Sequence, residues 1–170
     1  MTADVQQLLD ERAIREVLLR YCRGVDRLEL DLVRDCYHPD AIDDHGSFRG
    51  GVDEYLAWIG RLLPRYEVTM HLLGNTLVEF SPDRPDVARV ETYGVAIHQK
   101  PGGAPELNLT IGFRYLDRFE RREPAGWRVA DRLCTTEWVR RTDPADIFPV
   151  DGRFLRGQRG NRSDAVFRPW

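Results

Sequence analysis

The sequence predicts an α+β protein in which a curved antiparallel sheet packs against three N-terminal helices. Apolar residues recur at helical spacing as far as Leu63, whereas the chain after Tyr66 consists of long β-like runs separated by turn clusters. This order, helices first and strands afterwards, is typical of the α+β class. The 170 residues suffice for one domain, which we expect over residues 1–140, followed by an arm over residues 141–170.

Three helices are predicted before the strands. The first covers Val5–Val25, where apolar side chains follow three- and four-residue steps. Gly24 and a second apolar cluster over Leu30–Cys36 predict a break and then a short second helix. Apolar residues over Val52–Leu63 predict the third helix, which should end near Pro64.

The strands follow a different pattern. Tyr37–Asp40 has turn chemistry that should end the second helix, and Ala41–Phe48 should then form a short strand. Four longer runs, bounded by turn clusters such as SPDRPD, KPGGAPE and EPAG, predict a meander over Glu67–Phe80, Val87–Gln99, Leu107–Arg121 and Trp127–Trp138.

The arm is rich in Arg, Gly, Pro and Asp, yet it retains the apolar residues Ile147, Phe148, Phe154, Leu155, Phe167 and Trp170. Such a segment either is disordered or docks its aromatic side chains on the body or on a neighbouring subunit. We expect its first half to dock.

The composition argues against several classes of partner. No apolar run approaches the roughly 20 residues that a membrane span requires, and the first residues lack the order of a secretory signal. A net charge of -3 gives no broad attraction to nucleic acid. Three widely spaced cysteines without a C-x-x-C pair indicate neither a disulfide framework nor a zinc knuckle. We expect a cytoplasmic protein that binds neither membranes nor nucleic acid.

Asp26 and His71 are the first candidates for chemistry. Asp26 lies near the end of the first helix, where both burial and the helix dipole disfavour a carboxylate, so it either needs a partner or is simply solvated. His71 lies in an apolar strand and titrates near neutrality, so it could act as a general base beside a carboxylate. The commoner role of a single strand histidine is a hydrogen bond to the backbone within the core.

The strand after the SPDRPD turn has one face of small residues that ends in a histidine, Val90, Thr92, Gly94, Ala96 and His98. Small side chains leave room for a ligand, so this face suits a pocket wall. The opposite face carries Tyr93, Val95 and Ile97, which predicts either a subunit interface or burial on both sides.

His45 is the third candidate, and its alternation places it opposite in facing to Asp44. His38 stands before Pro39 in the predicted turn and should be a surface residue. Histidines and a carboxylate could together hold a divalent metal, but no short ligand spacing supports that minority interpretation. The chain also lacks G-x-S-x-G, phosphate-loop and dinucleotide motifs.

These features resemble the SnoaL-like branch of the nuclear transport factor 2-like superfamily, which includes scytalone dehydratase, bile acid 7α-dehydratase and hexachlorocyclohexane dehydrochlorinase. The resemblance covers roughly Glu11–Trp138 and is carried by YCRGVDRLELDLVRDCYHPDA, TMHLLGN, ETYGVAIHQ and GFRYLDRFERREPAGWRVADR. It implies a cone-shaped half-open barrel with a small-molecule pocket and no cofactor. It also implies a homo-oligomer, either a trimer or a dimer.

The resemblance assigns roles to individual residues. Asp26 matches the helix-end Asp, and His71 matches the strand His that pairs with it in the dehydratases and the dehydrochlorinase. Tyr21 matches a catalytic Tyr of the bile acid enzyme. His98 matches a second catalytic His of scytalone dehydratase, and His45 matches a pocket Tyr of that enzyme.

The chain departs from scytalone dehydratase where Val25 replaces a Tyr, and where the pocket Ser and Asn have no clear counterpart. Scytalone is therefore not implied as the substrate. The predicted site comprises the catalytic residues His71, Asp26, His98 and Tyr21 and the substrate-binding residues His45, Trp58, Tyr93 and Val25.

The leading hypothesis is a cofactor-independent lyase that removes water, or another leaving group, from a small hydrophobic cyclic substrate. His71 would take the proton α to a carbonyl while Asp26 orients its ring, and His98, with Tyr21 or His45, would protonate the departing oxygen or bind the enolate. An isomerase would use the same residues. The alternative is a non-catalytic subunit, similar to the β subunit of ring-hydroxylating dioxygenases, since fold alone does not settle function.

Overall fold

The computed structural model describes residues 3–100, 108–147 and 150–168. The helical part comprises α1 (Ala3–Arg27), α2 (Leu30–Arg34), α3 (Val52–Leu62) and the 3-10 turn η1 (Leu63–Arg65). The strands are β1 (Tyr37–Asp44), β2 (Arg49–Gly51), β3 (Val68–Phe80), β4 (Val87–Gln99), β5 (Leu109–Arg122) and β6 (Gly126–Arg141). Two short 3-10 turns, η3 (Pro144–Asp146) and η4 (Ala165–Phe167), lie in the arm.

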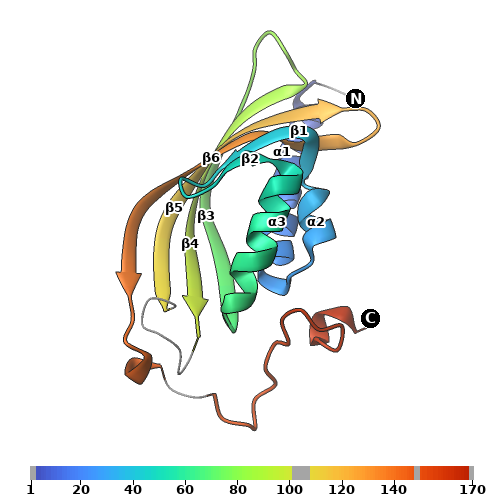
Figure 1. Cartoon of the computed structure of the whole chain (residues 1–170). Helices are drawn as coiled ribbons and strands as arrows, with labels where there is room; N and C mark the ends of the chain where they lie inside the picture. The colour runs from blue at the N-terminus through green and yellow to red at the C-terminus, as the bar shows by residue number, and fades with distance from the viewer. Residues whose placement is uncertain (1–2, 101–107, 148–149, 169–170) are drawn as a thin grey trace.

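The predicted α+β class is confirmed, with a six-stranded sheet in the order β2-β1-β6-β5-β4-β3. Figure 1 shows the sheet curling around the three helices, which lie on its concave side. The end strands β2 and β3 do not pair with each other, so the described sheet is not closed into a barrel. One pairing differs from an antiparallel meander, because β1 runs parallel to β6.

Irregular pairing gives the sheet its curvature. The register between β5 and β6 shifts once between Gly112 and Phe113 and again between Arg118 and Phe119. An extra residue in one strand bends that strand and increases its local twist. The bends let β5 and β6 fold over the helices, so that side chains of the concave face converge on one space.

The periodic pattern of the first helix explains its burial. One stripe of α1 is buried in the core, and it consists of Ile14, Val17, Leu18, Tyr21, Cys22 and Val25. Near its end, α1 approaches α2 so closely that a Cβ on Gly24 would lie 2.7 Å from Cγ2 of Val33. Gly24 therefore permits the contact that sets α2 against α1, although the helix itself continues to Arg27.

The prediction of a turn at Tyr37–Asp40 is wrong, because β1 begins at Tyr37. Tyr37 pairs with Val129 of β6, and the register is irregular between Tyr37 and Ile42. Pro39 lies within that irregular stretch, where its missing N–H interrupts no ladder. His38 is 2 % exposed and bonded through Nε2 to the carbonyl oxygen of Glu120 at 2.8 Å, so the prediction of a surface residue is wrong too.

The longer strands lie close to their predicted positions. The bounds of β4 match the prediction, and β6 extends past Trp138 to Arg141. Leu107, expected to begin a strand, lies outside the described residues, as does most of the KPGGAPE turn. Among the helices that the structure describes, none has the length and hydropathy that a membrane span requires.

The arm contacts the body through its second half, opposite to expectation. Phe154 and Leu155 are 65 % and 71 % exposed, whereas Asp164 is buried and its carboxylate lies 3.3 Å from the guanidinium of Arg27. Arg159 bonds to carbonyl oxygens at the end of α1 and around η1. Phe148 of the first half, which was expected to dock, lies outside the described residues, as does Trp170 at the end of the arm.

Candidate functional site

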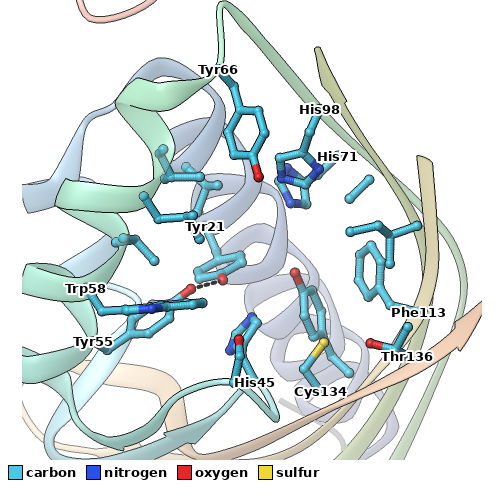
Figure 2. Close-up of a pocket in the computed structure, with 18 residues that line it drawn as sticks. Tyr21, His45, Tyr55, Trp58, Tyr66, His71, His98, Phe113, Cys134 and Thr136 are labelled. Carbon is cyan, nitrogen blue, oxygen red and sulfur yellow. Dashed lines mark hydrogen bonds between the residues drawn. The ribbon is translucent and has the colours of Figure 1, made fainter. Parts of the chain in front are cut away.

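A cavity of about 230 Å³ lies between the concave face of the sheet and the helices α1 and α3. Figure 2 shows its lining side chains pointing inward from opposite sides. Most of them are apolar or aromatic, and they include Val25, Tyr55, Trp58, Ile59, Leu62, Leu63, Tyr66, Ala96, Ile111, Phe113 and Tyr115. The polar groups are few, as is typical of a site for a small organic ligand.

Asp26 and His71 meet at the wall of this cavity. The His71 ring Nδ1 lies 2.7 Å from Oδ1 of Asp26, and the His71 backbone N–H donates to Oδ2 at 2.9 Å. One carboxylate thus holds both the ring and the backbone of a single residue. With Nδ1 donating to Asp26, Nε2 is the ring nitrogen left to accept a proton.

The environment keeps Asp26 ionised. Burial acts to raise the pKa of this carboxyl, but the hydrogen bonds and charge of His71 outweigh burial and lower it below its ordinary value. A carboxylate beside Nδ1 fixes the tautomer of the ring and stabilises the imidazolium that forms when the ring takes a proton.

His98 stands next to His71, with ring centroids 5.6 Å apart and planes at 86°. The ring of Tyr66 lies 4.8 Å away on another side. Burial, followed by the nearby His71, lowers the pKa of His98 to about 4, so its ring is neutral at pH 7. Its Nδ1 is buried and has no hydrogen-bond partner within the described part of the chain.

Tyr21 lines the cavity from α1, and its hydroxyl is hydrogen bonded to the hydroxyl of Tyr55 on α3. Burial raises the pKa of Tyr21, and the charge of Arg132 opposes only part of that rise. The phenol therefore keeps its proton at neutral pH. No sequence pattern pointed to Tyr55 as its partner, although Tyr55 belongs to the predicted apolar stripe of the third helix.

His45 enters the cavity from the segment after β1, on the side away from His71 and His98 (Figure 2). Its Nδ1 is hydrogen bonded to the buried carboxylate of Asp43. Behind this pair, Arg132 and Asp117 form a fully buried ion pair with two bonds of 2.7 Å. The alternation of the predicted short strand indicated that Asp43 shares a face with His45, but nothing in the sequence marked Arg132.

Val25 and Trp58 line the cavity as expected, but the structure does not bring Tyr93 there. Tyr93 is 47 % exposed on the outer face of β4, where the guanidinium of Arg114 lies 5.7 Å from its ring centroid. The period of two that faces His98 inward turns Tyr93 outward. Its expected place in the pocket was therefore wrong.

Within residues 3–100, 108–147 and 150–168, no three His, Cys, Asp or Glu side chains converge as a potential ligand set. The three cysteines are free thiols, and burial raises the pKa of each, so they remain protonated at neutral pH.

Comparison with solved structures shows the same fold. A hexachlorocyclohexane dehydrochlorinase (LinA, type 2) superimposes with a TM-score of 0.76 and 20 % identity, over 88 % of this chain and 99 % of that one. A scytalone dehydratase-like protein of Novosphingobium aromaticivorans gives a TM-score of 0.71 and 18 % identity, over 81 % and 90 % of the two chains. At these identities the likeness concerns the fold.

Comparison of sequences gives the family. Uncharacterized proteins of Mycobacterium tuberculosis and Mycobacterium bovis are 28 % identical over 135 residues, which is 77 % of this chain and 88 % of theirs. The family model of the SnoaL-like domain matches residues 6–133, from the first helix to the last strand. The chain belongs to the SnoaL-like family.

Proposed function

We propose that the protein is a cofactor-independent lyase that eliminates water, or another leaving group, from a small hydrophobic cyclic substrate. The observation that carries this proposal is the His71–Asp26 pair at the wall of a mostly apolar cavity of about 230 Å³. Removal of a proton from carbon requires a base that is held in one tautomer next to the bound substrate.

The first step is proton transfer from the carbon α to a carbonyl group to Nε2 of His71. Asp26 holds the ring through Nδ1 and stabilises the imidazolium. Negative charge then develops on the substrate carbonyl oxygen. His98 is neutral at pH 7 and adjoins His71, so its ring N–H can donate to that oxygen without adding a second positive charge.

The cavity wall favours a cyclic apolar substrate. Trp58, Phe113 and Ile111 present flat or branched apolar surfaces around a volume suited to one small ring system. These side chains also exclude water, which strengthens the electrostatic interactions at the base. Similarity to solved dehydratase-type and dehydrochlorinase folds supports elimination as the reaction class.

An isomerase is the second candidate, because the same residues could return the proton to another carbon. The hydrogen-bonded hydroxyls of Tyr21 and Tyr55 favour this candidate specifically, since they offer a protonated donor for a dienolate oxygen. Product analysis separates the two reactions, because elimination releases water and isomerisation leaves the mass unchanged.

We also propose that the protein assembles with copies of itself. The outer face of the sheet has a groove lined by Leu72, Tyr93, Val95 and Trp138, and three of these side chains are 45 % exposed or more. An exposed apolar patch of this kind is common at protein interfaces. Sedimentation as a monomer at micromolar concentration would contradict this proposal.

Cyclic β-hydroxyketones test the proposed reaction, because the enone product absorbs in the ultraviolet. We expect turnover by the native protein and a loss of kcat/KM of about 10²–10⁴-fold in His71→Gln, the range for removal of a general base. Asp26→Asn should reduce kcat as well. His38→Gln is the matched control, because it replaces a buried histidine remote from the cavity. Equal rates in His71→Gln and the native protein would rule the mechanism out.

A further inference from the structure

A second histidine–carboxylate pair lies on the far side of the same cavity. Nδ1 of His45 is hydrogen bonded to Oδ1 of Asp43, and the hydroxyl of Tyr37 donates to Oδ2 of Asp43 at 2.6 Å. Asp43 is 1 % exposed. Figure 2 shows the His45 ring across the cavity from His71 and His98, so a bound ligand would lie between the two pairs.

Within the part of the chain that the structure describes, Asp43 is a buried carboxylate without an arginine partner. The guanidinium of Arg132 is bonded twice to Asp117, at 2.7 Å in each case, and both side chains are fully buried. Arg132 is linked to Asp43 through the hydroxyl of Tyr37, to which it donates at 3.3 Å. Since a buried carboxylate is costly unless it is paired or hydrogen bonded, the contact with Nδ1 of His45 is the one that compensates Asp43 on the cavity side.

The hydrogen bonds around Asp43 run in one direction. Arg132 donates to Tyr37, Tyr37 donates to Asp43, and Nδ1 of His45 donates to Asp43. Burial raises the pKa of Tyr37 well above its ordinary value, so this phenol keeps its proton and its role as donor. Asp43 thus fixes the Nδ1 proton of His45, and Nε2 is the nitrogen that can exchange a proton with a ligand.

Packing also fixes the His45 ring. It stacks on the ring of Tyr55, with centroids 5.2 Å apart and planes at 22°. It also makes an edge-on contact with the ring of Tyr115, with centroids 6.0 Å apart. Within the described residues, Nε2 of His45 has no hydrogen-bond partner in the protein. A ring held by stacking and by one carboxylate presents its remaining nitrogen in a constant direction.

We propose that His45 is the acid that protonates the leaving group, and that Asp43 is the positioning residue that holds it. This inference rests on the proposed lyase function. The C–H proton passes to Nε2 of His71, and its electron pair forms the new C=C bond. The C–O bond breaks with its electrons on oxygen, which takes the proton from Nε2 of His45 and leaves as water. His71 then loses one proton to solvent and His45 regains one, so the cycle closes.

The other polar groups of the cavity are less suited to this step. The Tyr21 hydroxyl is engaged with Tyr55, and its raised pKa makes it a weak acid. His98 adjoins the base instead of facing it, and with a pKa of about 4 it has no proton to release as an imidazolium at pH 7. Among the described residues that line the cavity, His45 alone combines a carboxylate partner with a place opposite His71.

Two substrates that differ only in the leaving group test this assignment. Hydroxide needs protonation to leave, whereas acetate or chloride does not. The probes are a cyclic β-hydroxyketone and the matching β-acetoxyketone, with enone formation measured for each. In His45→Gln we expect a loss of about 10²–10⁴-fold in kcat/KM for the hydroxyketone and little change for the acetoxyketone. Asp43→Asn should show the same selectivity with a smaller loss.

Controls separate this role from a structural one. Asp44→Asn changes the neighbouring carboxylate, which is bonded to the Gly46 N–H instead of to a histidine, and it should leave both rates unchanged. Thermal unfolding checks that each variant folds. Asp43 is deeply buried, so if Asp43→Asn does not fold, His45→Gln alone tests the assignment. Equal losses on both substrates, or a loss on neither, would overturn the assignment of His45 while leaving the lyase in place. Absence of turnover of either substrate by the native protein would overturn both.

Discussion

Arg159 donates a hydrogen bond from Nε to the backbone carbonyl oxygen of Asp26 at 2.8 Å, although 133 residues separate the two. Its other nitrogens donate to the carbonyl oxygens of Leu63, Tyr66 and Val25 at 2.8, 3.1 and 3.2 Å. One guanidinium from the arm therefore joins the end of α1 to the end of α3, which form two walls of the cavity.

Replacement of Arg159 should affect both stability and the site. A cation at a helix C-terminus is favourable, and unpaired buried carbonyls are costly. Burial lowers the pKa of Arg159 to about 10, so it is still charged at pH 7. We expect Arg159→Ala to lower the free energy of unfolding by about 1–3 kcal/mol and to reduce kcat, because Asp26 loses its backbone anchor.

Arg159→Lys is the informative companion, because an ammonium group keeps the charge but lacks the planar fork that reaches several carbonyls. It should recover only part of the stability. Urea unfolding monitored by tryptophan fluorescence, together with the enone assay, checks both effects. Full native stability in Arg159→Ala would show that the arm does not contribute to the domain.

The sequence predicted the elements of this fold well, because burial imposes a period on each of them. The stripe of α1 and the alternation of β4 located Tyr21, Val25 and His98 on faces that do line the cavity. The same alternation placed Tyr93 on the outer face. The prediction that Tyr93 binds substrate conflicted with that position and was wrong. The parallel pairing of β1 with β6 was missed, because a strand that begins with Tyr37-His38-Pro39 carries the chemistry of a turn.

Contacts between distant residues were harder to foresee. Asp26 and His71 were paired by resemblance to a family, since periodicity alone cannot say which helix end meets which strand. Arg132 and Asp117 face each other in the register of β5 and β6, but arginine and aspartate are rarely fully buried, so residue type favoured solvent for both. Arg159 lies in an arm without any periodic pattern, and its contacts depend on tertiary structure.

Stability should fall as the pH drops below neutrality, because the buried His38 and the partly buried His98 are neutral in the fold. Burial is the largest cause that lowers the pKa of His38 and of His98, in each case to about 4. In the unfolded chain a histidine titrates near 6.5. Between about pH 6.5 and 4 the unfolded state therefore binds more protons, so the free energy of unfolding rises with pH across this window.

The contribution of the two neutral histidines to the free energy of unfolding is complete above pH 6.5 and is lost as the pH falls towards 4. It is on the order of 1–3 kcal/mol for each histidine. Urea unfolding at intervals between pH 7.5 and about 4.5 measures the slope. His38→Gln retains a donor for the Glu120 carbonyl and removes the titration of His38, so it should make the slope smaller, with the contribution of His98 remaining. A curve that is level in the native protein would contradict the assignment of neutral histidines.

The buried ion pair of Arg132 and Asp117 should be costly to break from one side. Asp117→Asn leaves the guanidinium charge without its partner in a site with no exposure, and removal of one member of such a pair costs about 3–5 kcal/mol. Glu91→Gln is the matched control, because its partner Arg114 is partly exposed and such pairs contribute about 0–1 kcal/mol. Equal effects of the two substitutions on urea unfolding would show that water reaches Arg132.

The outer face of the sheet gives the last prediction. Trp138 packs against Gly112, where a Cβ would clash with its indole nitrogen, so the absence of a side chain at Gly112 lets the ring cover β5. Trp138 is 49 % exposed in the isolated chain, and contact with a second copy would bury it. We expect Trp138→Arg to shift sedimentation from an oligomer to a monomer, because a charge in an apolar interface loses its hydration.

Leu19→Arg, at a leucine of α1 that is 63 % exposed, is the matched control and should leave the oligomer intact. If both variants sediment as the native protein does, the copies meet through another surface.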